Sequence, residues 1–412
     1  MIHLDHNATT RPCDEAISAA EAAMRECWHN PSSVHRAGQA ARQMVDRARG
    51  QVASLLGVKA RDLTFTSSAT EAIDFAHRGV MTLAAPAGKP VILTTAIEHE
   101  AVRDICAALA EPMDRGGVGA EVVHVPVTVE GVVDLDALAR LLDEHDGRIG
   151  LVSVQWANNE TGAVQPVGAI GALCRDREVL FFCDATQWVG KMPIVLDQPR
   201  SPFGGEPMAR PEEAVRIDLL CLSGHKFHGI KGAGVLYCDR SVRLKPQILG
   251  AQEKGRRGGT EPVPAIAAMG AAAEVAQEWL RDASHRQRIA EMRDRLEQTL
   301  IERVEGAHRN GPSEPGSRLW NTTNIAFPGC EAEALLLQFS ERGLAASAGA
   351  ACSSGSLDPS PVLLSMGVPE VSAHGSIRFS LSRETTDAEI DEAIEIVTRC
   401  VQRVRRAGAS AT

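Results

Sequence analysis

Short apolar runs alternate with amphipathic helical stretches through much of the chain, and this alternation restricts the possible folds more than any other feature. Six runs are interpreted as strands, at residues 91–95, 121–127, 149–157, 179–184, 217–223 and 233–238. Helical patterns accompany them: Val45, Val52 and Leu55 fall on one face of a helix over 41–56, and Asp134 caps another over 134–144. The alternation predicts an α/β fold with a mostly parallel, doubly wound sheet.

The pattern changes after Gly259, which indicates a second, smaller α+β domain. We expect a long helical stretch from about 265 to 304, a strand at 323–327 and a last helix that begins with a capping box at 386–389. The Pro- and Gly-rich segment 198–215 is expected to be a surface loop of the first domain. The predicted parts are a large α/β domain at 15–260, a small α+β domain at 261–412 and a joining N-terminal segment at 1–14.

Charge and hydropathy exclude several classes of protein. The chain has 43 basic and 53 acidic residues, which gives a net charge of −10. It therefore lacks the overall basic character that binding to nucleic acid or an anionic membrane favours. No apolar run reaches the length of a membrane span. The first residues do not form a signal peptide, so we predict a cytoplasmic protein with no membrane partner and no direct contact with nucleic acid.

Ten cysteines are present, and their spacing does not suggest a disulfide or zinc framework. No two are three residues apart, which excludes a CxxC zinc knuckle or redox pair. Cys183 and Cys221 lie inside apolar runs and are predicted to be small core residues. Cys352 differs, because only small residues surround it in the stretch 343–355. It is either a reactive thiol on a mobile loop or an incidental one, since reactivity requires a lowered pKa.

The segment 223–229, with the sequence SGHKFHG, directly follows an apolar strand. Lys226 therefore lies at the carboxyl end of a strand, the edge at which open α/β sheets bind ligands. A lysine there is a candidate for a Schiff-base amine, and the alternative is a solvated surface lysine. Cys221, His225 and His228 could suggest zinc, but no fourth ligand has suitable spacing, so we predict no metal site.

Other polar residues are expected near the same edge. Asp184 ends another apolar strand, where it either faces the pyridinium nitrogen of pyridoxal phosphate or caps a helix. The segment 67–72 follows a strand-like stretch at 63–66, and its hydroxyls and amides would suit a phosphate. Arg378 stands inside an apolar run, where it could bind a substrate carboxylate or form a structural ion pair.

Taken together, these segments closely resemble the cysteine desulfurases of the nitrogen-fixation and iron–sulfur-cluster type. Those enzymes belong to the class V aminotransferase group and have the fold-type I architecture of pyridoxal-phosphate enzymes. The resemblance covers nearly the whole chain in order. It is carried by residues 4–10, 30–35, 65–72, 97–99, 157–162, 184–187, 223–226, 257–261, the Cys352 loop and 376–380.

The resemblance implies the catalytic roles. Lys226 would carry pyridoxal 5'-phosphate covalently, and His99 would stack on its ring and move protons. Cys352 would take the sulfur of L-cysteine as a persulfide, with release of L-alanine. This division of labour is chemically coherent, since the cofactor delocalises charge while the C–S bond breaks and a thiolate accepts the sulfur.

The resemblance also implies the binding residues. Asp184 would hold the pyridine nitrogen of the cofactor and Gln187 its ring hydroxyl. Thr260 would reach the phosphate from the neighbouring subunit of a homodimer. The other cofactor contacts implied are Ala69, Thr70, Ser223, His225 and Asn159, and the implied substrate contacts are Asn7, Asn159 and Arg378.

The stretch 353–360 resembles the long loop of desulfurases that pass sulfur to a scaffold or carrier protein. The acceptor stays open: an iron–sulfur scaffold, a tRNA-thiolation relay, a nitrogenase partner or a DNA-modification system. Three departures from the family pattern are the added length at 198–215, Ala350 in place of a serine and Ser382 in place of a glycine. The alternatives are a selenocysteine lyase or another class V aminotransferase or lyase, including a kynurenine-type hydrolase, and a non-catalytic interaction protein. Cys352 favours the desulfurase because transamination needs no thiol.

Overall fold

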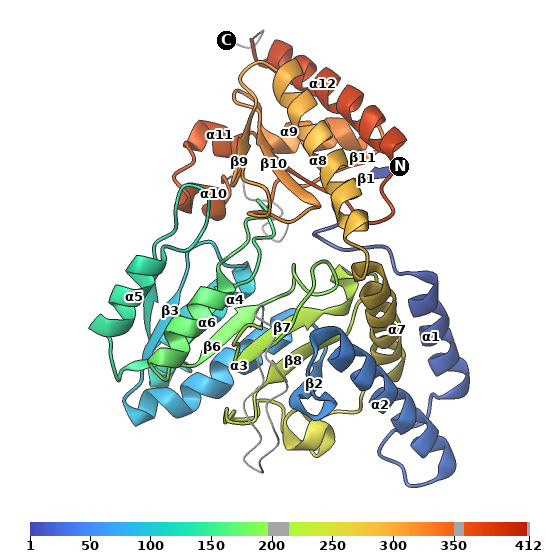
Figure 1. Cartoon of the computed structure of the whole chain (residues 1–412), viewed down its shortest axis with the longest axis vertical. Helices are drawn as coiled ribbons and strands as arrows, with labels where there is room; N and C mark the ends of the chain where they lie inside the picture. The colour runs from blue at the N-terminus through green and yellow to red at the C-terminus, as the bar shows by residue number, and fades with distance from the viewer. Residues whose placement is uncertain (197–213, 350–357, 410–412) are drawn as a thin grey trace.

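The computed structural model describes residues 1–196, 214–349 and 358–409 (Figure 1). Its large sheet has seven strands in the order β2-β8-β7-β6-β5-β3-β4. β8 pairs antiparallel with β2 and β7, and the other four pairings are parallel, which confirms the predicted fold class. The strands are β2 (Leu63–Thr66), β3 (Val91–Thr94), β4 (Glu121–His124), β5 (Ile149–Gln155), β6 (Phe181–Asp184), β7 (Leu219–Ser223) and β8 (Gly234–Cys238).

Helices cover both faces of this sheet, because successive strand residues point to opposite sides. In β6, Phe181 and Cys183 enter one core and Phe182 enters the other. The first core is shared with α1 (Asp14–Glu26), α2 (Arg36–Leu56), α5 (Leu135–Glu144), α6 (Val167–Asp176) and α7 (Val263–Leu280). The second is shared with α3 (Ala69–Ala84) and α4 (Glu100–Ala110). A strand buried on both faces must be apolar throughout, as the sequence pattern indicated.

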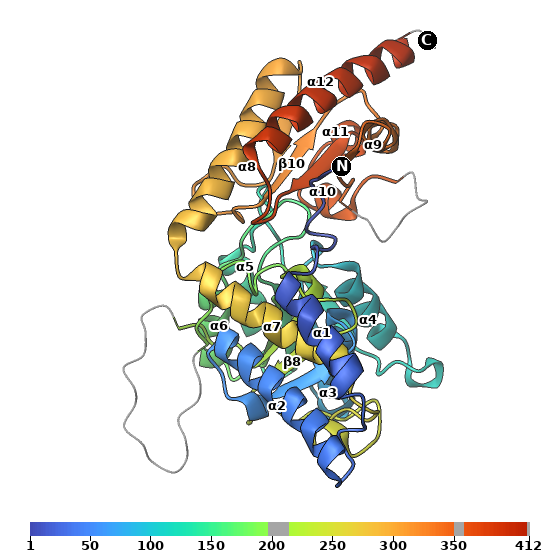
Figure 2. The same ribbon diagram turned by 90° about the vertical axis from the view of Figure 1, so that its right-hand side faces the viewer.

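A second, antiparallel sheet has β10 (Thr322–Ala326) between β9 (His308–Asn310) and β12 (Ser376–Ser380). It has its own apolar core, which includes Leu296, Phe339 and Phe379. β1 (Ile2–His3) pairs with β11 (Leu344–Ala345), so the chain begins beside this sheet before it crosses to α1 (Figure 2). The helices after α7 are α8 (Ala283–Arg303), α9 (Ala332–Ser340), α10 (Pro361–Ser365), α11 (Glu370–His374) and α12 (Asp387–Ala409).

The helical stretch expected over 265–304 consists of two helices, and the break between them was not predicted. α7 ends at Leu280, and the side chain of Asp282 then accepts a hydrogen bond from the Ser284 amide at 2.8 Å to start α8. α7 packs with α1 and α2, whereas α8 lies with the small sheet (Figure 2). α7 therefore shares the larger core, although the boundary predicted after residue 260 assigns it to the small domain. The domain limits themselves stay a prediction.

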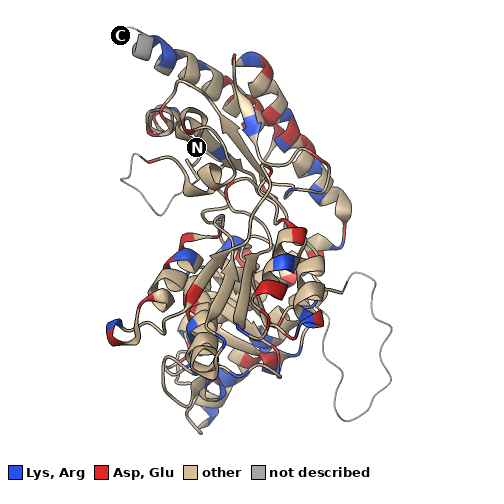
Figure 3. Ribbon diagram, turned by 90° about the vertical axis from the view of Figure 1, so that its left-hand side faces the viewer, with Lys and Arg blue, Asp and Glu red and all other residues tan. Residues whose placement is uncertain are grey.

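The predicted helix starts are confirmed. The Asp134 side chain accepts from the Ala137 amide at 2.9 Å, and Thr386 and Glu389 exchange the two bonds of a capping box. Acidic and basic residues are mixed along α8 and α12, and the seven-stranded sheet is drawn largely tan (Figure 3). No helix in the described ranges is long and apolar enough to cross a membrane. Cys352, Ala350 and nearly all of the segment 198–215 lie outside the described residues.

Candidate active site

Two neighbouring parallel strands bring Asp184 and Lys226 to one edge of the large sheet. Asp184 is the last residue of β6, and β7 continues into a short 3₁₀ turn, Gly224–Lys226. Both strands therefore end where open α/β sheets bind ligands. The Lys226 ammonium nitrogen Nζ donates to the carbonyl oxygens of Asn7 at 2.7 Å and Ala8 at 2.8 Å. The N-terminal segment thus lies directly across this strand end.

Asp184 is buried and is held by its neighbours. Its Oδ1 accepts from the Thr186 amide at 2.9 Å and from the thiol of Cys221 at 3.2 Å. The turn that follows β6 therefore uses one carboxylate oxygen. Oδ2 forms no hydrogen bond with the residues that the structure describes. Cys183 and Cys221 are fully buried as predicted, but Cys221 also serves as a donor to this carboxylate.

His99 precedes α4 and caps it, since its Nδ1 accepts from the Ala101 amide at 3.1 Å. In the neutral ring the proton is then on Nε2. Burial lowers the pKa of His99, the nearby Asp184 carboxylate opposes this effect, and Lys226 adds to it. A largely neutral imidazole near both groups can exchange a proton at Nε2 at neutral pH.

The strands next to β7 bring the start of α3 to the same sheet edge as Ser223. Ser223 pairs with Gly234 across β7 and β8, and Gly234 pairs with Thr66 in β2. A Cβ at Gly234 would lie 2.4 Å from the carbonyl carbon of Ser68, so glycine allows α3 to begin close against β8. The first-turn amides of Ala69 and Thr70 therefore come to the same edge as Ser223.

His225 lies in the 3₁₀ turn that carries Lys226, and Thr260 lies on a loop that contacts the start of α3 through Arg257. The His225 ring nitrogen Nδ1 lies 3.1 Å from the Thr9 hydroxyl, and burial lowers the pKa of His225 to about 4. Arg257 pairs with Glu71 in the first turn of α3 at 2.7 Å, which fixes the loop that carries Thr260. Thr260 itself is exposed.

Arg378 is buried at the opposite side of the N-terminal segment. One guanidinium nitrogen donates to Asp5 Oδ1 at 2.6 Å and another to the carbonyl oxygen of Asn159 at 3.0 Å. Its Nε is buried and has no hydrogen-bond partner in the described residues. The structural ion pair expected as the alternative is therefore present, and one donor is left over for a substrate.

The Asn7 side chain is fully engaged within the protein. Its Nδ2 donates to the Asn159 carbonyl at 3.1 Å and to the Thr322 hydroxyl at 2.9 Å. Its Oδ1 accepts from Lys191 at 2.8 Å and from Asn321 at 3.1 Å. Contact between Asn7 and a substrate stays a prediction, and it would require one of these bonds to break.

Comparison with known proteins agrees with this geometry. The family model described as aminotransferase class V matches residues 2–393. Cysteine desulfurase 2 of Trichormus variabilis is 43% identical over 406 residues, which cover 98% of this chain and 94% of the relative. The chain belongs to the cysteine desulfurases of the class V aminotransferase family. These desulfurases are enzymes that depend on pyridoxal 5'-phosphate, so the predicted family, enzyme class and cofactor are confirmed.

Other relatives and solved structures place this desulfurase in the same family. Cysteine desulfurase IscS of Methanosarcina thermophila is 37% identical over 98% of this chain and 93% of the relative. A solved NifS-like protein matches with a TM-score of 0.84 and 32% identity, over 97% of this chain and 99% of the other. A structure of SspA in complex with cysteine matches with a TM-score of 0.75 and 27% identity, over 94% and 100%.

The residues present fit pyridoxal phosphate. Its phosphate, pyridine nitrogen and aldehyde require an anion site, a carboxylate and an amine, respectively. The desulfurase provides these groups at one sheet edge as the start of α3, Asp184 and Lys226. The buried Nε of Arg378 adds a donor suited to the carboxylate of an amino acid.

Sequence reasoning missed three polar groups near the predicted site residues. Asp5 pairs with Arg378, Glu98 lies next to His99, and Lys191 is only 4% exposed. One signal was available: Lys191 follows Gln187 by four residues, the spacing that brings side chains together on a helical turn.

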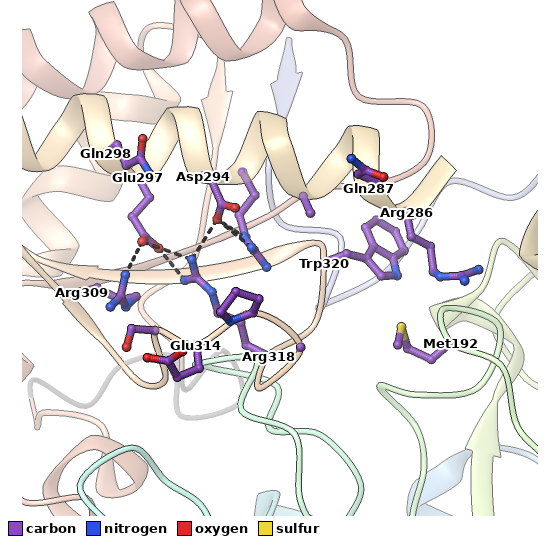
Figure 4. Close-up of a pocket in the computed structure, with 15 residues that line it drawn as sticks. Met192, Arg286, Gln287, Asp294, Glu297, Gln298, Arg309, Glu314, Arg318 and Trp320 are labelled. Carbon is purple, nitrogen blue, oxygen red and sulfur yellow. Dashed lines mark hydrogen bonds and ion pairs between the residues drawn. The ribbon is translucent and has the colours of Figure 1, made fainter. Parts of the chain in front are cut away.

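A pocket of the small domain lies away from these residues (Figure 4). It has a volume of about 380 Å³ and is formed by α8 and the segments around β9 and β10. Glu297 pairs with Arg309 at 2.6 Å and with Arg318 at 2.5 Å inside it, so these three charged side chains are already engaged with one another. A much smaller cavity of about 20 Å³ is lined by both Lys191 and Lys226. This second cavity therefore borders the predicted catalytic lysine.

Proposed function

We propose that this chain removes sulfur from L-cysteine, releases L-alanine and holds the sulfur as a persulfide on Cys352. The observation that carries the proposal is the meeting of Asp184, Lys226 and His99 at one sheet edge. Bound pyridoxal phosphate would supply an electron sink for cleavage of the C–S bond. The Cys352 thiolate attacks the substrate sulfur and an S–S bond forms as the C–S bond breaks. The electron pair stays on carbon, which takes a proton to become the methyl group of alanine.

Cofactor binding is assigned to the groups at this edge. Lys226 forms the covalent link, Asp184 holds the ring nitrogen and Gln187 donates to the ring hydroxyl oxygen. Ala69, Thr70, Ser223 and His225 bind the phosphate, and His99 packs on the ring. The start of α3 supports the phosphate assignment, because its free amides suit an anion. Ser223 pairs with Gly234, and Gly234 lies against Ser68, so Ser223 is near that helix start.

Substrate binding is assigned to the region around Arg378. Its Nε and the half-buried side chain of Asn159 are available to the carboxylate of L-cysteine, with Asn7 behind them. The Asp5 carboxylate competes for the same guanidinium. Arrival of the substrate carboxylate would therefore exchange one ion pair for another, which keeps the buried charge paired.

We also assign the assembly and the partners. The enzyme is proposed to be a cytoplasmic homodimer in which Thr260 reaches the phosphate of the partner's site. The persulfide sulfur would pass to a scaffold or carrier protein. The exposed position of Thr260, on a loop held to α3 by the Arg257–Glu71 pair, supports a role across an interface.

The test separates cofactor binding from sulfur transfer. Cys352→Ala should bind pyridoxal phosphate and L-cysteine as the wild type does, since Lys226, Asp184 and the phosphate contacts are intact. It should form alanine at least about a hundredfold more slowly, because the acceptor thiol is gone. Mass spectrometry of wild-type protein treated with L-cysteine and an alkylating probe should find one extra sulfur on the Cys352 peptide.

Cys27→Ala is the matched control, because Cys27 is partly exposed and far from the catalytic lysine in sequence. It should retain wild-type turnover. Normal alanine formation by Cys352→Ala, together with an extra sulfur on Cys330 or Cys183, would make Cys352 an incidental thiol and refute the proposed mechanism.

A further inference from the structure

Lys191 is a buried lysine without a carboxylate partner. Its Nζ donates to Gln187 Oε1 at 2.5 Å and to Asn7 Oδ1 at 2.8 Å. Within the described ranges no Asp or Glu forms an ion pair with it. Burial, with added repulsion from Lys226 and Arg378, holds the pKa of Lys191 well below its ordinary value. A lysine kept in such surroundings is costly, so a specific role for its hydrogen bonds is expected.

The hydrogen bonds of Lys191 fix the orientation of two amides. Lys191 Nζ donates to both amides, so each of them turns its oxygen toward the lysine. The Gln187 nitrogen Nε2 therefore points away from Lys191 and donates to the Asn7 carbonyl oxygen at 3.0 Å. The same carbonyl oxygen accepts from Lys226 at 2.7 Å. A continuous network thus joins Lys191 to Lys226 through Gln187 and Asn7.

The backbone of Lys191 is also held in place. Its carbonyl oxygen accepts from the indole of Trp320 at 2.8 Å. Gly190 has a φ of +77°, and a Cβ there would lie 2.3 Å from Cβ of Phe227, the residue after Lys226. Only glycine allows the turn after β6 to approach this closely. The tertiary structure therefore fixes the position of Lys191 beside the segment that carries the catalytic lysine.

We propose that Lys191 is a positioning residue that makes Gln187 present an N–H donor, and not its oxygen, to the ring hydroxyl oxygen of pyridoxal phosphate. This inference rests on the proposed function for the contact between Gln187 and the cofactor. A flipped amide would lose the bond that Oε1 accepts from Lys191 and the bond that Nε2 donates to the Asn7 carbonyl, and it would turn its oxygen toward the cofactor oxygen. The flip is therefore disfavoured on both sides of the amide.

The experiment measures the affinity of pyridoxal phosphate for the apo-protein and the visible absorbance of the bound cofactor. Lys191→Met keeps the length of the side chain and removes its donor. We expect binding about tenfold weaker, the effect of one lost hydrogen bond to a charged group, and an absorbance change in the direction of that of Gln187→Ala. Lys59→Met is the matched control at an exposed lysine and should bind as the wild type does.

A double mutant tests whether Lys191 acts through Gln187. If it does, Lys191→Met combined with Gln187→Ala should bind the cofactor as Gln187→Ala alone does, within about twofold. Losses that multiply would overturn the inference. So would wild-type affinity and absorbance in Lys191→Met accompanied only by a lower melting temperature, since that pattern indicates a purely structural role.

Two further variants keep the test decisive if Lys191→Met does not fold. Gln187→Glu offers Lys191 an oxygen and an ion pair but has no donor for the cofactor, so it should fold and bind at least about tenfold more weakly. Wild-type affinity in this variant would refute the inference. Lys191→Arg retains a donor and should recover part of the affinity and absorbance lost in Lys191→Met; no recovery in a folded Lys191→Arg would count against it.

This experiment measures cofactor binding and changes neither Cys352 nor the reaction with L-cysteine. Its failure can therefore be told apart from failure of the proposed function. A wild-type protein that does not bind pyridoxal phosphate would refute both. A wild-type protein that binds it, together with an unaffected Lys191→Met, would refute only the role of Lys191.

Discussion

Glu98, next to His99, is a carboxyl that the fold keeps away from water. Its oxygens contact the Thr95 hydroxyl at 2.7 Å and the Gln155 amide at 2.9 Å, and burial raises its pKa from 4.5 to about 8. A protonated Glu98 can donate to Thr95 while it still accepts from Gln155. At neutral pH this side chain therefore acts as a neutral spacer behind His99, and Asp184 remains the carboxylate that faces the cofactor site.

A pH dependence of stability follows for Glu98→Gln. Between pH 4.5 and about 8 the unfolded chain releases this proton while the folded protein keeps it. The Glu98 carboxyl therefore lowers the free energy of unfolding of the wild type as pH rises, by up to about 1.4 kcal/mol per pH unit. Glutamine does not titrate, so the variant should gain stability relative to wild type from pH 5 to pH 8 in denaturant unfolding of the holoenzyme. If the stabilities of wild type and Glu98→Gln changed with pH in parallel, Glu98 would not be a buried neutral carboxyl. Glu144→Gln, at an exposed position, is the control and should follow the wild type.

The turn between β8 and α7 depends on a buried ion pair with α2. Arg49 in α2 makes two bonds of 2.7 Å to the Glu253 carboxylate, which also accepts from the Phe65 amide at 2.9 Å. Glu253 and Lys254 adopt left-handed backbone angles, with φ of +47° and +60°. These conformations are unfavourable for residues other than glycine, so the pair is expected to hold the turn that leads toward Thr260.

Glu253→Gln should lower the free energy of unfolding by about 3 kcal/mol, because it leaves the Arg49 guanidinium buried without a carboxylate. The exposed pair between Glu121 and Arg148 has the same 2.7 Å distance, with both side chains about half exposed, and is the matched control. Glu121→Gln should cost less than about 1 kcal/mol. Equal losses in urea unfolding would show that burial of the Arg49 pair does not determine its contribution.

At the scale of the whole molecule, exposed apolar residues lie next to the loop that carries Thr260. Leu249 is 84% exposed and Ile248 is 43% exposed, and the Ile248 carbonyl accepts from the Gly258 amide at 2.8 Å. Exposed apolar residues beside the threonine proposed to act across subunits favour an interface at this surface. A two-fold interface would place both Thr260 loops near its axis, which agrees with the proposed homodimer.

Complementation between two inactive or weakened chains tests this assembly. In a mixed dimer of Lys226→Ala and Thr260→Ala, one site retains both residues and should have wild-type affinity and turnover. The mixed sample should therefore exceed the activity of either homodimer, and light scattering should give the mass of two chains. Activity no greater than the average of the two homodimers, or a fully active monomer, would exclude a shared site.

Much of this description could be predicted from local patterns. Alternating apolar runs and helical stretches predicted the sheet because a strand buried on both faces must be apolar along its length. Asp184 and Lys226 could be placed together because parallel strands end at the same edge. The capping residues Asp134 and Thr386 were identified because a helix start is satisfied by side chains close in sequence.

Other features depend on contacts between distant parts of the chain. The break between α7 and α8 was missed because the residues of both helices favour helix formation. The two helices pack into separate cores, and each core is made by residues far apart in the sequence. Lys191 is buried because Trp320, from the turn before β10, and the N-terminal Asn7 contact it. Whether a charged side chain is solvated or enclosed depends on such neighbours, and periodicity in the sequence does not record them.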